Sequence, residues 1–260
     1  HDRILSKKEN GTKPGTVQPM YYAGQHFESE PAADDHIWKY MDFSRFVSLL
    51  DSKSLFFGSA ARMRDPWEGA FGPGSTVDPN YIQHLRDLRT REMMYMSCWS
   101  VGEFESAALW DLYQPDGKGV AIRSTWGRLT GAVDTHLYLV GGTVKYIDHS
   151  ETDISPINIF KTYVYKRQQL EYEHEARLLY WTGSERENDP PLTEGDEAPI
   201  PEDTLFRPGV PVSVDLEVLV ESVYVAPNAE AWVADLVRSV IAKYGHDFDV
   251  VESALYFEPK

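Results

Sequence analysis

The chain has 260 residues, of which 42% are hydrophobic and 13% aromatic, enough for one large core or for two lobes that share one. Its 25 basic and 41 acidic residues give a formal net charge of −16. This charge opposes non-specific binding to nucleic acid or to an anionic membrane, although a local basic cleft stays compatible with it. The single cysteine, Cys98, excludes an internal disulfide framework and a cysteine-rich zinc site.

The same features predict the compartment. One cysteine fits a reducing, cytoplasmic setting. No apolar run approaches the roughly 20 residues that a transmembrane helix needs, and the N-terminal residues lack the apolar segment of a signal peptide. We therefore expect a cytoplasmic protein with no membrane contact.

The first half of the chain predicts a folded region that begins after an N-terminal arm, residues 1–35, which has no periodicity. Asp42 is a candidate N-cap, and apolar residues follow it at helical spacing until Lys53. Residues 60–80 are rich in Gly and Pro and predict a long loop. The expected elements are the strand Ile37–Tyr40, the helix after Asp42, the strand Leu55–Gly58, the helix Asn80–Thr90 carrying Arg86 and Arg89, the strand Tyr95–Trp99 and the helix Ser106–Tyr113.

The second half continues the mixture of strands and helices. Residues 183–205 are acidic and rich in proline, which predicts a mobile surface loop. The expected elements are the strands Gly119–Arg123 and Leu137–Ile147, a helix from Ser155 towards Arg167, the strands Ala176–Trp181, Val210–Val214 and Val223–Val225, a helix that Asn228 caps, with Trp232, Leu236, Val240 and Ile241 inward and Gly245 ending it, and a last strand Val250–Phe257. This irregular order predicts one α+β domain over residues 36–260, a mainly antiparallel sheet flanked by helices.

The stretch Tyr165–Trp181 is the strongest candidate for chemistry. It opens with Lys166 and Arg167, places glutamates at every second position and ends in an apolar run. If its second half is a strand, Glu173, Glu175 and Arg177 share one face. Two such carboxylates repel each other, so solvent, a cation or a polar ligand must offset the repulsion. The alternative is a solvated strand edge with Arg177 as the counter-ion.

Three further stretches combine polar and aromatic residues. Trp38-Lys39-Tyr40 precedes the first helix. Arg64-Asp65-Pro66-Trp67-Glu68-Gly69 contains a proline turn, and its alternative interpretation is a purely structural turn. Ser97-Cys98-Trp99-Ser100 leads through Glu105-Ser106 to Trp110 and Tyr113, and its alternative is core aromatic residues with a helix cap. We expect Asp65, Glu68, Trp99, Trp110, Arg167 and Glu175 to line or support one concave site.

Taken in order, these stretches resemble a bacterial family known as a domain of unknown function. Its pattern is Y-K-Y, then D-P-x-E-G, S-W-S, E-S-x-x-x-W, K-R and E-x-E-x-R. Here the pattern reads as Trp38-Lys39-Tyr40, Asp65–Gly69, Ser97–Ser100, Glu105–Trp110, Lys166-Arg167 and Glu173–Arg177. The family also has L-Y-F-S where this chain has Leu55–Gly58. The departures, at packing positions, are Gly58 for the serine, Cys98 for a tryptophan and Leu170 for an aromatic residue. The resemblance covers roughly residues 36–257.

A weaker resemblance is to the ADP-ribosyltransferase fold of bacterial toxins, which implies a split sheet and NAD as the substrate. It implies that Glu175 holds a ribose hydroxyl and steadies the cationic transition state, while Glu173 orients or deprotonates an acceptor. Lys39 and Tyr40 stand where that family has Arg or His. The implied catalytic residues are Glu175, Glu173 and Arg177. The implied binding residues are Lys39, Tyr40, Arg64, Asp65, Trp67, Glu68, Ser97, Trp99, Trp110, Tyr113, Lys166 and Arg167; Trp67, Tyr40 or Trp99 would stack on a base, and Arg64 or Arg62 would pair with the pyrophosphate.

Three functions follow as hypotheses. The first is an ADP-ribosyltransferase-like enzyme, a toxin or phage-defence effector with a small nucleotide ligand and a macromolecular acceptor or cognate inhibitor. The second is a non-catalytic ligand-sensing or interaction module. The third is a metal nuclease using Asp65, Glu68, Glu173 and Glu175 with Lys166, although the −16 charge disfavours an extended nucleic-acid surface. No histidine pair has zinc-protease spacing, so no metal site is predicted.

Overall fold

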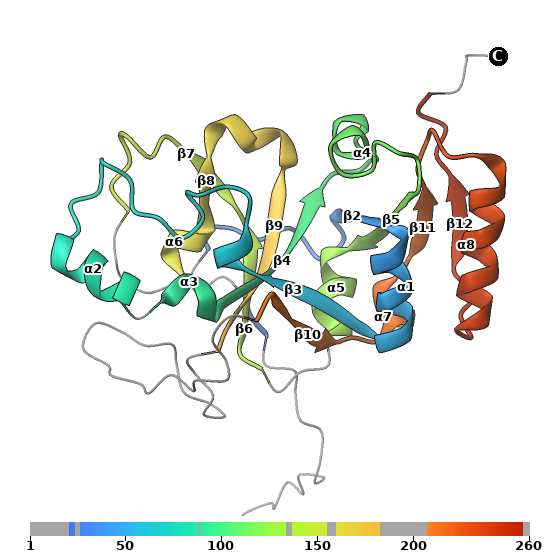
Figure 1. Ribbon diagram of the computed structural model, residues 1–260, viewed down its shortest axis with the longest axis horizontal. Coiled ribbons are helices and arrows are strands. Elements are labelled where there is room, and N and C mark those ends of the chain that lie inside the picture. The colour runs from blue at the N-terminus through green and yellow to red at the C-terminus, as the bar shows by residue number, and fades with distance from the viewer. Residues whose placement is uncertain are drawn as a thin grey trace, which may run out of the picture.

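A twisted sheet runs through the centre of the computed structural model, which describes residues 21–23, 27–87, 89–133, 137–154, 160–182 and 207–256 (Figure 1). Its strand order is β1–β6–β9–β4–β2–β5–β11–β12, and β3 joins β4 and carries β10. Most neighbours are antiparallel, whereas β1 with β6 and β11 with β12 are parallel. The strands are β1 Tyr21–Ala23, β2 His36–Asp42, β3 Ser54–Ser59, β4 Met94–Val101, β5 Gly119–Thr125, β6 Leu139–Thr143, β7 Lys145–Ile147, β8 Tyr165–Arg167, β9 Glu175–Trp181, β10 Gly209–Ser213, β11 Ser222–Val225 and β12 Asp249–Glu252.

Helices flank this sheet, so the chain has the predicted α+β architecture with a mainly antiparallel sheet (Figure 1). Strands β7 and β8 form a separate parallel pair beside it. Within the described residues, no helix has the length and apolar character that crossing a bilayer requires. The helices are α1 Phe43–Ser52, α2 Pro79–Asp87, α3 Thr90–Met93, α4 Ala107–Tyr113, α5 Trp126–Ala132, α6 Lys161–Val164, α7 Leu216–Leu219 and α8 Ala231–Lys243, with short 3₁₀ helices η1 Ala60–Arg62 and η2 Gln168–Glu173.

The opening unit β2–α1–β3 forms as the sequence predicts. The Asp42 carboxylate accepts the backbone N–H of Arg45 at 2.9 Å and caps α1. Lys53 ends the helix in the left-handed conformation, with φ 49°. The apolar face of α1, including Phe46 and Leu50, is buried in the core.

Strand β4 changes its neighbour half-way along its length, and this change opens the sheet. Its first half pairs with β3, through Met96 and Gly58, whereas its last residues pair with β2, through Ser100 and Trp38. Strand β2 stays paired with β5 from His36 to Asp42. Because β2 leaves β4 directly after Trp38, the two strands splay apart at Lys39.

The two faces of the central strands meet different cores. One face carries Ile37, Tyr95, Trp99 and Leu178 and packs against α1, α5, α7 and α8. The opposite face divides in two. Near β6, β9 and α6 it is apolar and includes Met96, Leu179 and Trp181, and beneath α4 it consists of Trp38, Trp110, Ala121 and Ala226. Alternation along β4 therefore places Ser97 and Trp99 on one face and Cys98 and Ser100 on the other.

The structure corrects several predicted boundaries. The predicted helix Asn80–Thr90 ends at Asp87, and Arg89 stands in the left-handed conformation before α3. The predicted strand Leu137–Ile147 is two strands, β6 and β7, which belong to different sheets. Helices α5 and α7 have too few turns for the periodicity to reveal them. The last strand ends at Glu252, and residues 155–159 and 183–206, which hold the predicted cap and the acidic loop, lie outside the described residues.

Helix α8 has its apolar face turned from the predicted one. Trp232 is 53% exposed and Leu236 36% exposed, whereas Val233, Ala234 and Val237 are buried. Asn228 does not cap the helix, because its side-chain amide donates to the Pro115 carbonyl. Gly245, with φ 84°, follows the last turn as predicted. Ile241 is buried as predicted, and Val240 packs against the core. The buried face of α8 therefore combines Ile241 with smaller apolar residues, whereas Trp232 and Leu236 face outward.

Candidate functional site

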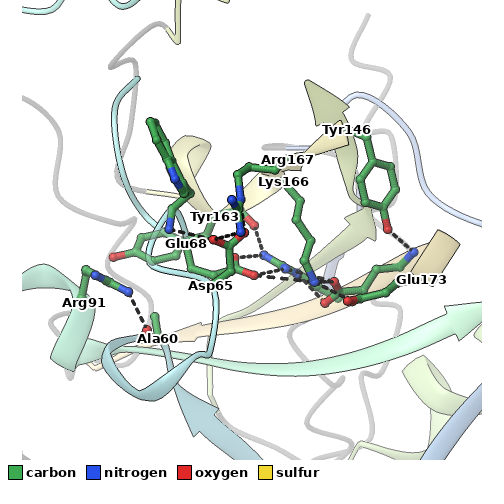
Figure 2. Close-up of polar contacts among 12 residues, drawn as sticks. Ala60, Asp65, Glu68, Arg91, Tyr146, Tyr163, Lys166, Arg167 and Glu173 are labelled. Carbon is green, nitrogen blue, oxygen red and sulfur yellow. Dashed lines mark hydrogen bonds and ion pairs between the residues drawn. The ribbon is translucent and has the colours of Figure 1, made fainter. Parts of the chain in front are cut away.

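The start of β9 holds a cluster of charged side chains that we call the charged cluster: Glu68, Lys166, Glu173, Glu175 and Arg177 (Figure 2). Arg177 lies at its centre and is 0% exposed. Its Nη1 and Nη2 donate to the two oxygens of Glu68 at 2.8 Å each. Nε and Nη2 also reach Glu175, and Nη1 donates to the Tyr163 carbonyl at 2.9 Å. All five N–H groups of the guanidinium therefore have acceptors inside the protein.

Glu175 is equally committed to partners within the chain. Oε1 accepts from Arg177 at 2.7 Å, and Oε2 accepts from Lys166 Nζ at 2.7 Å and from Arg177 at 3.0 Å. Its backbone N–H donates to the Tyr146 hydroxyl at 2.8 Å. Burial opposes ionisation, but the charges of Arg177 and Lys166 outweigh it and hold the pKa of Glu175 well below 4.5. Both carboxylate oxygens are thus occupied, and only 3% of the residue is exposed.

Glu173 forms the outer edge of the charged cluster. Its Oε2 accepts from Lys166 Nζ at 2.6 Å, and its side chain is 13% exposed against 4% for Glu175. Burial raises the pKa of Glu173, because Lys166 is shared with Glu175 and attracts Glu173 too weakly to outweigh burial. Lys166 itself sits 3.8 Å from Glu68, and these surrounding carboxylates raise its pKa despite burial.

Strand alternation is not what brings Glu173 to Glu175. Glu173 belongs to η2, and His174 follows it in the left-handed conformation with φ 43° before β9 begins at Glu175. The prediction of one continuous strand face was therefore wrong for Glu173. The backbone reverses at His174, and the two carboxylates meet at Lys166 because of that reversal.

The 65–69 loop supplies the other side of the site. Asp65 accepts the backbone N–H of Trp67 at 3.1 Å and both Nε and Nη2 of Arg167, at 3.1 and 3.0 Å. Gly69, with φ 75°, is where the loop turns, and a Cβ there would lie 2.5 Å from the Tyr163 ring. Trp67 packs on His149 with ring centroids 5.1 Å apart. Figure 2 shows Asp65, Glu68, Lys166 and Arg167 pointing towards one another.

Lys39 occupies the splay between β2 and β4. Its Nζ donates to the Ser97 Oγ at 3.2 Å and the Cys98 carbonyl at 2.9 Å, and it lies 5.2 Å from the centre of the Trp99 ring. The residue stays partly accessible to solvent. In the described part of the chain Lys39 has no ion pair with a carboxylate, and burial lowers the pKa of its amine. Its hydrogen-bond partners are both neutral, and the attraction of the Glu175 carboxylate is too weak to outweigh burial.

The aromatic residues predicted for base stacking are mostly committed to the interior. Trp99 and Trp110 are each 1% exposed, so neither has a free ring face. The Tyr40 hydroxyl accepts the backbone N–H of Ser106 at 2.7 Å, and burial raises its pKa to about 12. Tyr40 and Trp110 meet edge to face at 5.0 Å and hold α4 in place. Tyr113, at the end of α4, is exposed.

The predicted site residues thus form two groups rather than one. Glu68, Lys166, Glu173, Glu175 and Arg177 are joined by ion pairs, and Asp65 and Arg167 pair beside them. Lys39 lies at the splay beside Ser97 and Trp99, within electrostatic reach of Glu175. Arg64 is exposed on its loop, and Tyr40 and Trp110 support α4. Two hollows lie near α8 and β12, and no predicted site residue lines either of them. Sequence reasoning missed Tyr146 and the Tyr163 carbonyl, and no pattern in the sequence marks either residue.

No arrangement of three or more metal-ligating side chains that could hold a metal ion occurs in the residues the structure describes. Each carboxylate proposed for a metal nuclease instead has a cationic partner. Asp65 pairs with Arg167, Glu68 with Arg177, and Glu173 with Lys166. The third functional hypothesis therefore gains no support from the geometry.

No family model and no curated protein matches the chain, and the resemblance to the bacterial domain of unknown function stays a prediction. Among solved structures the chain is similar to Thermus sp. 2.9 DarT in complex with NAD+, at 10% identity and a TM-score of 0.41, covering 86% of this chain and 98% of that one. It is also similar to Thermus sp. 2.9 DarT in complex with ADP-ribosylated ssDNA, at 11% identity and a TM-score of 0.39, covering 86% and 96%. A superposition at these values assigns no role to any residue of this chain.

Proposed function

We propose that the protein is an ADP-ribosyltransferase-like enzyme that cleaves NAD and transfers ADP-ribose to an acceptor. The observation that carries this proposal is the cation of Lys39, which lies in the splay between β2 and β4 without a carboxylate partner in the described residues. A largely enclosed cation without an ion-pair partner favours an anionic ligand, because such a ligand supplies the missing counter-charge. The pyrophosphate of NAD is a ligand of this kind.

Glu173 is the carboxylate best placed to act on the nicotinamide ribose. Glu175 has both oxygens bound by Arg177 and Lys166, whereas Glu173 has one oxygen bound and keeps an exposed edge. When the bond between ribose and nicotinamide breaks, nicotinamide leaves with the bonding electron pair and the ribose becomes cationic. A fixed carboxylate stabilises that cation, and an acceptor then bonds to the ribose carbon and loses its proton. Glu175 and Arg177 act here as positioning residues that hold Lys166 and Glu173.

The test is nicotinamide release from NAD, followed by mass spectrometry of candidate acceptors. Glu173→Gln keeps the shape but removes the charge, so we expect turnover to fall by roughly 10²–10³-fold, the scale of one lost transition-state contact. Glu171→Gln is the matched control, because Glu171 is an exposed residue of the same short helix η2. Absence of NAD turnover in the unmodified protein overturns the proposal, and equal turnover in both variants overturns the role of Glu173.

A non-catalytic NAD-binding module is the second candidate, and the saturation of Arg177 and Glu175 favours it. A site that must react needs donors or acceptors left for the substrate, and neither residue has any. Isothermal titration calorimetry with NAD, together with the assay of nicotinamide release, distinguishes the two candidates. Saturable binding without nicotinamide release supports the module, and binding with release supports the enzyme.

A further inference from the structure

The surface around α4 carries large apolar side chains in the open. Phe104, just before the helix, is 82% exposed, and Leu112 and Tyr113 at its end are 39% and 49% exposed. Tyr256 adds a fourth large side chain from the C-terminal segment, because its hydroxyl donates to the Asp111 carboxylate of α4 at 3.1 Å. Exposed apolar groups this close together are typical of a surface that another molecule covers.

The charged side chains of the segment that carries α4 are all acidic. Residues 102–117 contain Glu103, Glu105, Asp111 and Asp116 and no Lys, Arg or His. Glu103 has a side chain that is 65% exposed. The α4 surface, defined by Phe104, Leu112, Tyr113 and Tyr256 with these acidic residues, is thus apolar and anionic.

From this combination we infer that the α4 surface docks a cationic, apolar segment of a partner protein. A basic segment gains from the acidic side chains, and its apolar residues cover the exposed rings. Aromatic rings also serve as platforms for nucleic-acid bases, but four acidic residues in residues 102–117 would repel the phosphates. A second copy of the chain would bring the same acidic residues against each other. The inference does not require that the protein cleaves NAD.

The experiment measures binding of a fluorescein-labelled amphipathic peptide of leucine and lysine to the full chain by fluorescence anisotropy, without NAD. Phe104→Ser with Leu112→Ser should weaken binding by about ten-fold or more, as loss of central apolar contacts does. The matched control is Trp232→Ser with Leu236→Ser, which removes two exposed apolar side chains from α8 and should leave the affinity within about two-fold. Glu103→Gln with Asp111→Asn should weaken binding and its dependence on salt.

Several results would overturn the inference. Equal loss in the α4 and α8 variants would mean that the peptide responds only to the net charge. Equally tight binding of a peptide with glutamate in place of lysine would remove the electrostatic basis. Binding of a thymine oligonucleotide that the α4 variant abolishes would make the surface one for nucleic acid, and a concentration-dependent dimer lost in that variant would make it a contact between copies. Melting curves of all variants establish that each is folded, and nicotinamide release is recorded separately, so the two proposals fail independently.

Discussion

Arg177 and Lys39 are two largely enclosed cations that interact with opposite faces of β4. They differ in whether carboxylates of the protein pair with them. Arg177 is held between Glu68 and Glu175, which raise its pKa despite complete burial. Lys39 binds a hydroxyl and a carbonyl beside an aromatic ring, and burial lowers its pKa. The first cation is neutralised within the fold, and the second is left for something else to neutralise. The comparison separates a residue that builds the site from a residue that is available to a ligand.

Arg177→Met tests the structural side and has the largest expected effect. The variant leaves Glu68 and Glu175 buried with one counter-charge fewer, and breaking a buried pair in this way costs about 3–5 kcal/mol of unfolding free energy. The melting temperature should fall by about 6–20 °C, since about 1 kcal/mol corresponds to 2–4 °C in a domain of this size. Adding Glu68→Gln should restore part of the loss. An Arg177→Met variant with the same melting temperature as the unmodified protein would show that the pairing contributes no net stability.

Lys39→Met tests the ligand side. Lys39 has no ion pair with a carboxylate in the described residues. Its removal therefore leaves no buried anion without a counter-charge, and we expect the melting temperature to change little. Binding of NAD should weaken by about ten- to a hundred-fold, the scale of one hydrogen bond to a charged group. Titration calorimetry with NAD measures this effect, and Arg45→Met on the exposed side of α1 is the control. If Lys39→Met kept its affinity for NAD but lost stability, Lys39 would be a structural residue rather than a ligand-binding one.

The pH dependence of stability separates the two sites further. The folded pKa of Glu175 lies below 4.5, so its contribution is present above that value and is lost as the pH falls through the folded pKa. The folded pKa of Lys39 lies below 10.5, so its unfavourable contribution is relieved as the pH rises towards 10.5. The difference in unfolding free energy between the unmodified protein and Glu175→Gln should therefore shrink in acid. In alkali, the unfolding free energy of the unmodified protein should rise relative to that of Lys39→Met. Denaturant titrations of each variant at several pH values measure both differences.

The smallest expected effect is on the stability of Glu173→Gln. Burial and attraction to Lys166 oppose each other at this residue, so the unfolding free energy should change by less than about 1 kcal/mol. Urea titrations of Glu173→Gln beside Glu171→Gln measure it. A loss comparable to that of Arg177→Met would place Glu173 with the structural group and remove the reason for assigning it a chemical role.

Local rules predict the elements whose signals lie within a few neighbouring residues. Asp42 and Lys53 mark both ends of α1, and the apolar run after Glu175 marks β9. Alternation failed at Glu173 because a single left-handed residue, His174, interrupts it. The prediction for α8 was right for Ile241 but wrong for Trp232 and Leu236, because bulk alone does not decide burial: Trp232 is exposed, and Val233 and Val237 fit against the sheet.

The candidate site was predicted by residue type and not by arrangement. Glutamates and arginines in separated stretches indicated that Glu68, Glu175 and Arg177 matter, but no sequence rule gives the bidentate pairing across 109 positions. The separation of Lys39 from the carboxylates depends on where β2 leaves β4, which is a property of the whole sheet. Trp99 and Trp110 were expected to contact a ligand but are core residues. The sequence does not distinguish the two roles, because an indole ring is suited both to a buried core and to stacking on a ligand.

The long separation between Glu68 and Arg177 has a consequence for how the chain is made. After Glu68 the ribosome adds 109 residues up to and including Arg177, which at about 5–20 residues per second takes roughly 5–20 seconds. During that interval Glu68 has no guanidinium to bind, so its loop stays hydrated until β9 joins β4. We expect the pairing of residues so distant in the chain to form after the folding transition state, where it slows unfolding without changing the folding rate. The charged cluster should thus govern how long a folded copy lasts rather than how fast one forms.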